Sequence, residues 1–241
     1  MNRNTAKIVS SKDSKKLEDV SVAILNAGVG ARIKSCEPRS LIKVKNRQII
    51  DWQLDAIEFA FVEPDIITVV GYKPQRVFKK IGDKIRIVEN QLHESTNNAE
   101  SLRLAFNASV TSNFIFLHGD LIFNRELLSE IDYSESFIVV DSKGMMKKSE
   151  VGLTEVDTKL SVLSYGLEKK WCQIAFFTGK ELNLLRGLFN KFNETSKKML
   201  SFELINQIIS DGGSFKCIEP KSMKILEIDT IKDVKNEDIN F

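Results

Sequence analysis

Carboxylates at two distant points of the chain have the types and the spacing needed to hold a divalent cation. Asp120 ends the apolar run NFIFLHGD (113–120), and open α/β sheets bind ligands beyond the carboxyl ends of their strands. Glu227 and Asp229 alternate in LEIDT (226–230), so a strand would place both carboxylates on one face, where they repel unless a cation lies between them. Oxygen ligands of this kind suit Mg²⁺. The alternatives are a turn aspartate that caps a helix and a solvated strand face.

A glycine-containing turn follows the first apolar run, VSVAILN (20–26). Backbone N–H groups in such a turn can bind an anion, and glycine permits close approach of a phosphate. The residues of the turn that would cradle the phosphate are Ala27, Gly28, Val29 and Gly30. Arg32 adds a permanently charged, forked partner for phosphate oxygens. An ordinary strand-to-loop turn is the alternative, because a GxG string alone is a weak signal.

Apolar periodicity predicts the elements that position these residues. In the first half, buried strands alternate with amphipathic helices at the spacing of βαβ units; the expected strands are 20–26, 65–72, 84–90 and 113–120, and the helices 49–61 and 99–109. In the second half the expected strands are 136–142, 150–157, 159–166, 172–179, 214–220 and 223–229, and the helices 180–192 and 201–210. We therefore expect an α/β fold with a single domain over 20–241, preceded by a flexible extension over 1–19. Within it, residues 20–125 form the nucleotide-binding half and residues 126–241 the acceptor-side half.

Composition excludes several classes of function. The formal net charge of +2 gives no electrostatic case for a nucleic-acid partner. The three cysteines, Cys36, Cys172 and Cys217, lie far apart and are expected to be reduced thiols. The polar N-terminus lacks the apolar segment of a secretory signal, and no apolar run is long enough to span a membrane. We expect a cytoplasmic protein and leave open whether it forms a homodimer.

The glycine turn and the downstream string Pro38-Arg39-Ser40-Leu41 together form a more specific sequence signal than the turn alone. Residues 25–41 resemble the signature L-x-A-G-x-G-x-R, then P-K-x-L, of the sugar-nucleotide pyrophosphorylase and cytidylyltransferase superfamily. The resemblance implies a Rossmann-like (GT-A-like) three-layer sandwich with a mixed, mainly parallel central sheet. It also implies an Mg²⁺-dependent nucleotidyltransferase that transfers a nucleoside monophosphate from a triphosphate to a phosphorylated acceptor, with Arg32 and Arg39 acting on the phosphates.

Two positions depart from this signature. Asn26 stands where the family commonly has alanine, and Arg39 stands where it has a lysine that contacts the phosphates. Arginine keeps the charge but replaces a compact ammonium by a planar fork, so the exchange is not neutral. This puts full catalytic efficiency in doubt.

The resemblance extends to the acids and to one helix start. It implies that Asp120 and Asp229, with Glu227, hold Mg²⁺, and that Asp233 caps the last helix. The string NNAESL (97–102) is typical of a helix N-cap, and it also resembles the phosphocholine cytidylyltransferase branch. That likeness favours CTP and a small acceptor such as phosphocholine or a sugar 1-phosphate. The residues that it places at the nucleotide are Asn90, Gln91, Asn98 and Ser101.

Three other functions compete with this interpretation. A nucleotide-binding protein with weakened catalysis would explain Arg39 and Asn26, but it would have less need of two metal-binding acids. A glycosyltransferase of related fold usually carries a D-x-D motif, whereas the run 113–120 ends in His-Gly-Asp. A dinucleotide-binding oxidoreductase needs a third glycine where this chain has Ile33.

Overall fold

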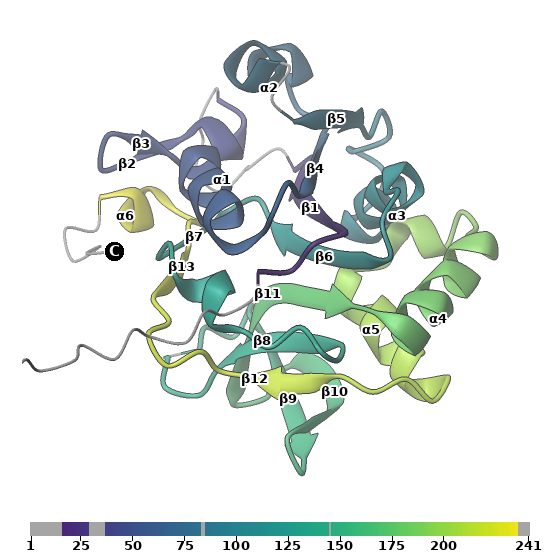
Figure 1. The fold of residues 1–241 in the computed structure, drawn as a ribbon. Helices are drawn as coiled ribbons and strands as arrows, with labels where there is room; N and C mark the ends of the chain where they lie inside the picture. The colour runs from purple at the N-terminus through teal and green to yellow at the C-terminus, as the bar shows by residue number, and fades with distance from the viewer. Residues whose placement is uncertain (1–15, 29–36, 83–84, 145, 236–241) are drawn as a thin grey trace, which may run out of the picture.

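The computed structural model describes residues 16–28, 37–82, 85–144 and 146–235 of the 241-residue chain. In this part of the chain, a nine-stranded sheet has the order β5-β4-β1-β6-β11-β8-β12-β10-β9 (Figure 1). Its strands are β1 (Val20–Asn26), β4 (Asp65–Val70), β5 (Arg86–Glu89), β6 (Asn113–His118), β8 (Phe137–Asp141), β9 (Val151–Val156), β10 (Lys159–Tyr165), β11 (Lys169–Phe177) and β12 (Lys216–Ile218). The pairings make β10 and β11 run opposite to the other strands, so the sheet is mixed and mainly parallel, as predicted.

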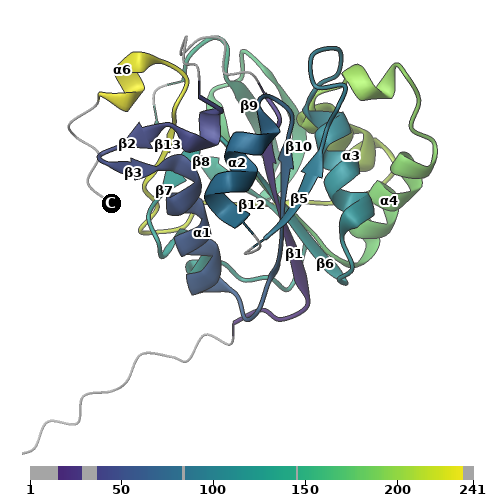
Figure 2. The same ribbon diagram turned by 90° about the horizontal axis from the view of Figure 1, so that it is seen from above.

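Helices cover both faces of this sheet, and its central strands β1, β4 and β6 accordingly bury both sets of alternating side chains. In β1, Val22 and Ile24 pack in the hydrophobic cluster beneath α1 (Ile49–Ala60) and α2 (Pro74–Ile81). Ala23 and Leu25 pack in the opposite cluster. The helices on that side are α3 (Asn98–Ala108), α4 (Gly179–Asn190) and α5 (Ser201–Ser210). Figure 2 shows α1 and α2 on one side of β1 and β6, and α3 and α4 on the other. The predicted three-layer α/β fold is confirmed.

The structure adds elements that periodicity did not predict. α2 begins at Pro74, and β7 (Leu121–Phe123) follows directly after the predicted strand end. β7 pairs with β13 (Ile225–Glu227) in a separate two-stranded sheet, and β2 (Lys43–Val44) pairs with β3 (Arg47–Gln48) in another. Strands of two or three residues are too short to show a period in the sequence. The remaining elements are α6 (Ile231–Val234) and the short 3₁₀ helices Arg39–Leu41, Leu127–Glu130 and Ser196–Lys198.

The first fifteen residues of the expected extension lie outside the described part of the chain. At its end, Leu17 forms an isolated bridge with Phe61, and its carbonyl accepts a hydrogen bond from the N–H of Val62 at 3.2 Å. The division into a nucleotide-binding half and an acceptor-side half stays a prediction. None of the helices in the described ranges combines the length and the hydropathy needed to cross a membrane.

Candidate active site

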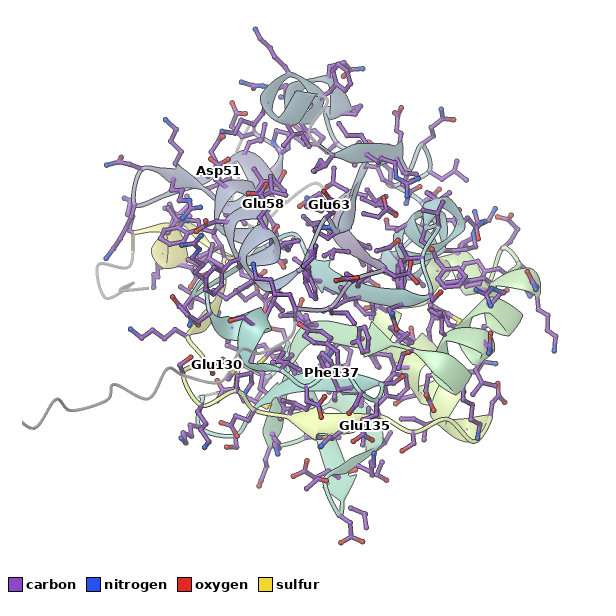
Figure 3. All side chains as sticks on the ribbon, viewed as in Figure 1. Asp51, Glu58, Glu63, Glu130, Glu135 and Phe137 are labelled. Atoms are coloured by element: carbon purple, nitrogen blue, oxygen red, sulfur yellow. The ribbon has the colours of Figure 1, made fainter. Side chains whose placement is uncertain are left out.

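Three carboxylates meet at the carboxyl end of β6. One oxygen each of Asp120, Glu227 and Asp229 lies within 4.8 Å of the other two. Asp120 and Asp229 are buried and Glu227 is partly buried, whereas the acids labelled on the outer elements, such as Asp51 and Glu135, are more open (Figure 3). Asp51 pairs with Lys80 at 3.0 Å, as surface acids commonly do. Three buried like charges at this spacing require a counter-charge.

Pairing between distant segments brings these acids together. β6 ends at His118, and Asp120 lies in the turn that leads into β7. β13 runs antiparallel to β7 with Glu227 opposite Leu121, and the N–H of Ile228 donates to the carbonyl of Asp120 at 2.8 Å. This register brings Glu227 and Asp229 close to Asp120. The cluster therefore depends on the β7–β13 pairing.

Side chains from α1 and β1 fix the turn that carries Asp120. The buried Gln53 amide donates to the carbonyls of His118 and Leu121, each at 2.9 Å. At Gly119, an added Cβ would lie 1.7 Å from the Asn26 side-chain oxygen, so only glycine fits. The Asn26 amide donates to the Thr68 hydroxyl at 2.8 Å. The Asn26 side chain, which stands where the signature has alanine, thus packs inside the sheet and supports the turn.

Arg39 supplies the positive charge at the cluster. Its guanidinium makes an ion pair with Asp120 through one nitrogen and lies 3.3 Å from Asp229 through the other. A forked guanidinium can engage two carboxylates at once, which a lysine ammonium cannot do with the same geometry. Burial, and then the charges of Asp120 and Asp229, raise the pKa of Glu227 well above its usual range. Two cations, Arg39 and the Lys170 ammonium that lies 3.8 Å from Glu227, thus face three carboxylates.

The donor set fits a divalent cation such as Mg²⁺. All three groups offer carboxylate oxygens, which hard cations prefer. Oδ1 of Asp120 is buried and has no hydrogen-bond partner within the described ranges. A buried acceptor without a donor is costly, and a cation would satisfy it. Asp120, Glu227 and Asp229 are the residues that would hold the ion.

A cavity of about 210 Å³ lies between β1 and the start of α3. Its lining includes Ala27, Gly28, Asn90, Asn98 and Ser101. The Asn90 amide donates to the Ser101 hydroxyl at 3.2 Å, so the two predicted nucleotide ligands form one polar wall. We call this the nucleotide-side cavity.

A larger cavity of about 390 Å³ shares Asn97 and Asn98 with the first and includes the acids in its lining. Asp120, Glu227, Asp229 and Arg39 lie along one wall, and the aromatic residues Tyr165, Trp171 and Phe202 contribute to the rest. We call this the acceptor-side cavity. A third cavity of about 150 Å³ shares Gly28 and Asn98 with the first, and Arg39 and Asp120 with the second. Asp120 and Arg39 thus line the third cavity as well as the acceptor-side cavity, whereas Glu227 and Asp229 line the acceptor-side cavity alone.

The structure brings together most of the residues singled out in the sequence. The exceptions are Gln91, which is exposed in a turn and does not line the nucleotide-side cavity, and three residues outside the described ranges: Val29, Gly30 and Arg32. The N-cap of α6 is Thr230, and Asp233, the predicted cap, lies at the third helical position, where its carboxylate accepts from the Thr230 N–H at 2.7 Å in a capping box. Trp171 is almost fully buried, yet it also contributes to the wall of the acceptor-side cavity.

Several residues at the cavities were not predicted. His118 is partly buried and lines the second and third cavities, and desolvation lowers the pKa of its imidazole. Ser201 begins α5 and lies 3.1 Å from His118 Nε2. Gln173 reaches the acids from the middle of β11. The helix start at Ser201 has a weak local signal, but nothing in the sequence around Gln173 distinguishes it from an ordinary strand residue.

Comparison with known sequences gives limited but consistent similarity. No protein-family model matches the chain. It is 30% identical over 83 residues to the bifunctional protein GlmU of Thermoanaerobacter pseudethanolicus, covering 34% of this chain and 18% of that protein. It is 27% identical over 168 residues to the choline-phosphate cytidylyltransferase of Streptococcus pneumoniae, covering 59% of this chain and 73% of that protein. The match to GlmU thus spans less than a fifth of that relative's length.

Solved structures support the fold over nearly the whole chain. The inositol-1-phosphate CTP transferase of T. maritima has a TM-score of 0.72 at 17% identity, covering 88% of this chain and 90% of that one. The CTP:phosphocholine cytidylyltransferase LicC of Streptococcus pneumoniae has a TM-score of 0.71 at 19% identity, covering 90% and 97%. The predicted resemblance is confirmed: the chain is similar in sequence to GlmU and to a choline-phosphate cytidylyltransferase, and it has the Rossmann-like fold of solved cytidylyltransferases.

Proposed function

We propose that this protein is a nucleotidyltransferase that transfers a nucleoside monophosphate from a nucleoside triphosphate, with CTP favoured, to a small phosphorylated acceptor. The observation that carries the proposal is the cluster of Asp120, Glu227, Asp229 and Arg39 in the wall of the acceptor-side cavity. Asp120 and Arg39 also line the third cavity, which shares Gly28 and Asn98 with the nucleotide-side cavity. The nucleotide-side cavity is lined by the predicted nucleotide ligands, and the acceptor-side cavity is large enough for a small acceptor. A binding protein without chemistry has no need of a charged cluster at such a place.

The reaction follows from this arrangement. A phosphate oxygen of the acceptor attacks the α-phosphorus of the triphosphate, a new P–O bond forms, and the bond from the α-phosphorus to the bridging oxygen breaks to release pyrophosphate. Asn90, Asn98 and Ser101 orient the nucleotide, and the Arg39 fork aligns phosphate oxygens at the junction of the cavities. A divalent cation held by the acids would neutralise charge on the phosphates. The protein thus acts by alignment and by compensation of charge.

The choice of CTP and of the acceptor class depends on the relatives. The choline-phosphate cytidylyltransferase and the inositol-1-phosphate CTP transferase both carry CTP chemistry or a cytidylyl group in their names. Both names also specify a phosphorylated small alcohol as acceptor. A phosphocholine-like acceptor or a sugar 1-phosphate remains our expectation for this chain, and Mg²⁺ is the proposed cofactor.

The test is pyrophosphate release with Mg²⁺, using each of the four common nucleoside triphosphates against phosphocholine, phosphoethanolamine, inositol 1-phosphate and sugar 1-phosphates. Asp120→Asn keeps the shape of the side chain but removes its charge, and it should lower turnover by about 100-fold or more. Asp132→Asn changes an exposed acid and should have no effect. Release that is specific for one pair of substrates and is lost only in Asp120→Asn supports the proposal.

Absence of pyrophosphate release with every pair of triphosphate and acceptor would contradict the proposal. If a triphosphate still raised the melting temperature under those conditions, nucleotide binding without transfer would be the better description. Equal activity in Asp120→Asn and the wild type would remove the acid cluster from the mechanism. The two failures are distinguishable because the first concerns the reaction and the second concerns the site.

A further inference from the structure

β11 contains a bulge next to the acid cluster. Trp171 pairs with Val140 of β8, but the next pairing joins Ala175 to Ile138, so β11 carries two extra residues between these positions. Gln173 lies inside the bulge with a φ of 58°, in the left-handed region. The Trp171 indole N–H donates to the carbonyl of Ile174 at 3.2 Å and so satisfies a group near the disrupted ladder. Bulges commonly re-aim a side chain beside an active site.

The bulge directs the Gln173 amide to the acid cluster. Nε2 of Gln173 donates to Oε2 of Glu227 at 2.7 Å. Lys170, on the same strand, approaches the same carboxylate oxygen at 3.8 Å while its Nζ pairs with Glu150 at 2.7 Å. Glu227 is therefore held through one oxygen from the β11 side. Residues that orient a metal ligand in this way affect metal binding without touching the metal.

Gln173 also lies near the nucleotide side of the site. It lines the acceptor-side cavity together with His118, whose Nε2 lies 3.3 Å from Asn98 Nδ2 and 3.1 Å from the Ser201 hydroxyl. Oδ1 of Asn98 accepts from the Ser201 N–H at 2.6 Å, so the Asn98 amide nitrogen faces the ring. Polar side chains thus line this wall from Asn98 to Glu227.

The backbone of Gln173 has an energetic cost. A residue with a Cβ is strained in the left-handed region, and asparagine or glycine tolerates that region better. A shorter amide at this position would relieve the strain but would not reach Glu227. Strain of this kind persists where the surrounding structure over-determines it, and it clusters at functional sites.

We propose that Gln173 is a positioning residue that holds Glu227 in the orientation needed to bind a divalent cation. The inference rests on the proposed metal site and adds a residue to it. Because Gln173 acts through Glu227, the inference predicts a change in metal affinity that is separate from any change in folding stability.

The test is Mn²⁺ binding to the full chain without nucleotide, measured by the electron paramagnetic resonance signal of free Mn²⁺. Gln173→Asn keeps an amide and suits the left-handed backbone, but it is one methylene too short to reach Glu227. We expect the Kd for Mn²⁺ to rise about tenfold, while the melting temperature stays equal to or above that of the wild type. Glu63→Asn is the matched control, because Glu63 also has a positive φ (43°) but lies exposed and outside the cluster. It should leave the Kd unchanged.

A double-mutant cycle distinguishes positioning from a general structural effect. Glu227→Gln removes the carboxylate that Gln173 orients, so adding Gln173→Asn to Glu227→Gln should weaken Mn²⁺ binding no further. An undiminished tenfold loss on that background would overturn the inference. So would a Gln173→Asn protein that binds Mn²⁺ like the wild type. Absence of Mn²⁺ binding by the wild type would instead overturn the metal site itself, and this inference with it.

Discussion

Arg39 stands where the resembled signature has a lysine, and its side chain contacts the acids of the site. Its two terminal nitrogens engage Asp120 and Asp229, and the guanidinium is about four-fifths buried. Each contact is charge-assisted, and the planar fork suits two acceptors. The exchange of lysine for arginine therefore affects the acids as well as the phosphates. This residue couples the charge of the cluster to the stability of the fold.

Replacing Arg39 with alanine tests that coupling. In buffer containing EDTA, Arg39→Ala should lower the free energy of unfolding by about 2–3 kcal/mol, because two buried carboxylates lose charge-assisted hydrogen bonds. Millimolar Mg²⁺ should raise the melting temperature of the variant more than that of the wild type, since a cation can replace the lost charge. Thermal unfolding with and without Mg²⁺ measures both effects. Lys197→Ala, which breaks only the pair with the exposed Glu194, serves as control and should change little.

At the scale of elements, the turn between β6 and β7 decides where Asp120 lies. The N–H of Gly119 donates to the carbonyl of Leu25 at 3.0 Å, so this turn closes directly against the end of β1. Gly119 is required because the Asn26 side chain and the Leu25 carbonyl leave no room for a Cβ, and not because its φ is positive. The Asn26 side chain occupies the space that a Cβ would need. The position of Asp120 therefore depends on a contact between two strand ends.

Gly119→Ala should destabilise the fold by about 3 kcal/mol, since overpacking at a contact with backbone on one side cannot relax freely. Pyrophosphate release should fall as well, because Asp120 would shift. Adding Asn26→Ala removes the 1.7 Å contact but leaves the Leu25 carbonyl at 2.9 Å, so stability should recover in part. Urea denaturation of the single and double variants measures the recovery. If the second substitution gave no recovery, the proposed contact would not be the cause.

At the scale of the whole molecule, one buried thiol, Cys172, and one partly buried thiol, Cys217, can be used to follow the packing of the sheet. Cys172 lies in β11 and Cys217 in β12, and burial raises the pKa of both thiols, to about 12 at Cys217, where Glu155 adds to the effect. A free thiol has a pKa of about 8.5. At a pH between the pKa of a free thiol and the raised pKa in the folded protein, the thiols keep their protons in the folded protein and lose them in the unfolded chain. The free energy of unfolding should therefore decrease as the pH rises above about 8.5.

Urea denaturation at pH 8 and at pH 10 measures this decrease. Each thiol contributes at most about 1.4 kcal/mol per pH unit. Cys217→Ala should reduce the loss between the two pH values, and Cys172→Ala should do the same. Both thiols should also react slowly with iodoacetamide in the native protein and rapidly in urea. An unchanged pH dependence in both variants would assign the decrease to other groups.

The local sequence determined much of this protein by itself. Apolar periodicity located most strands and helices of the nine-stranded sheet and its helical layers, because burial on two faces imposes a pattern on neighbouring residues. The turn at Gly28 and the acids Asp120, Glu227 and Asp229 were recognisable as candidates near the ends of such runs, and the resemblance to the superfamily signature supplied their expected roles.

Only the tertiary structure decided how these parts meet. Glu227 reaches Asp120 because β13 pairs with the short β7, and strand pairing between distant segments leaves no local pattern. Arg39 bridges two of the acids for the same reason. Gln173 faces Glu227 because β11 bulges against β8, and a bulge is defined by its partner strand. Residue type is a local property, whereas the contacts that give a residue its role depend on how the whole chain packs.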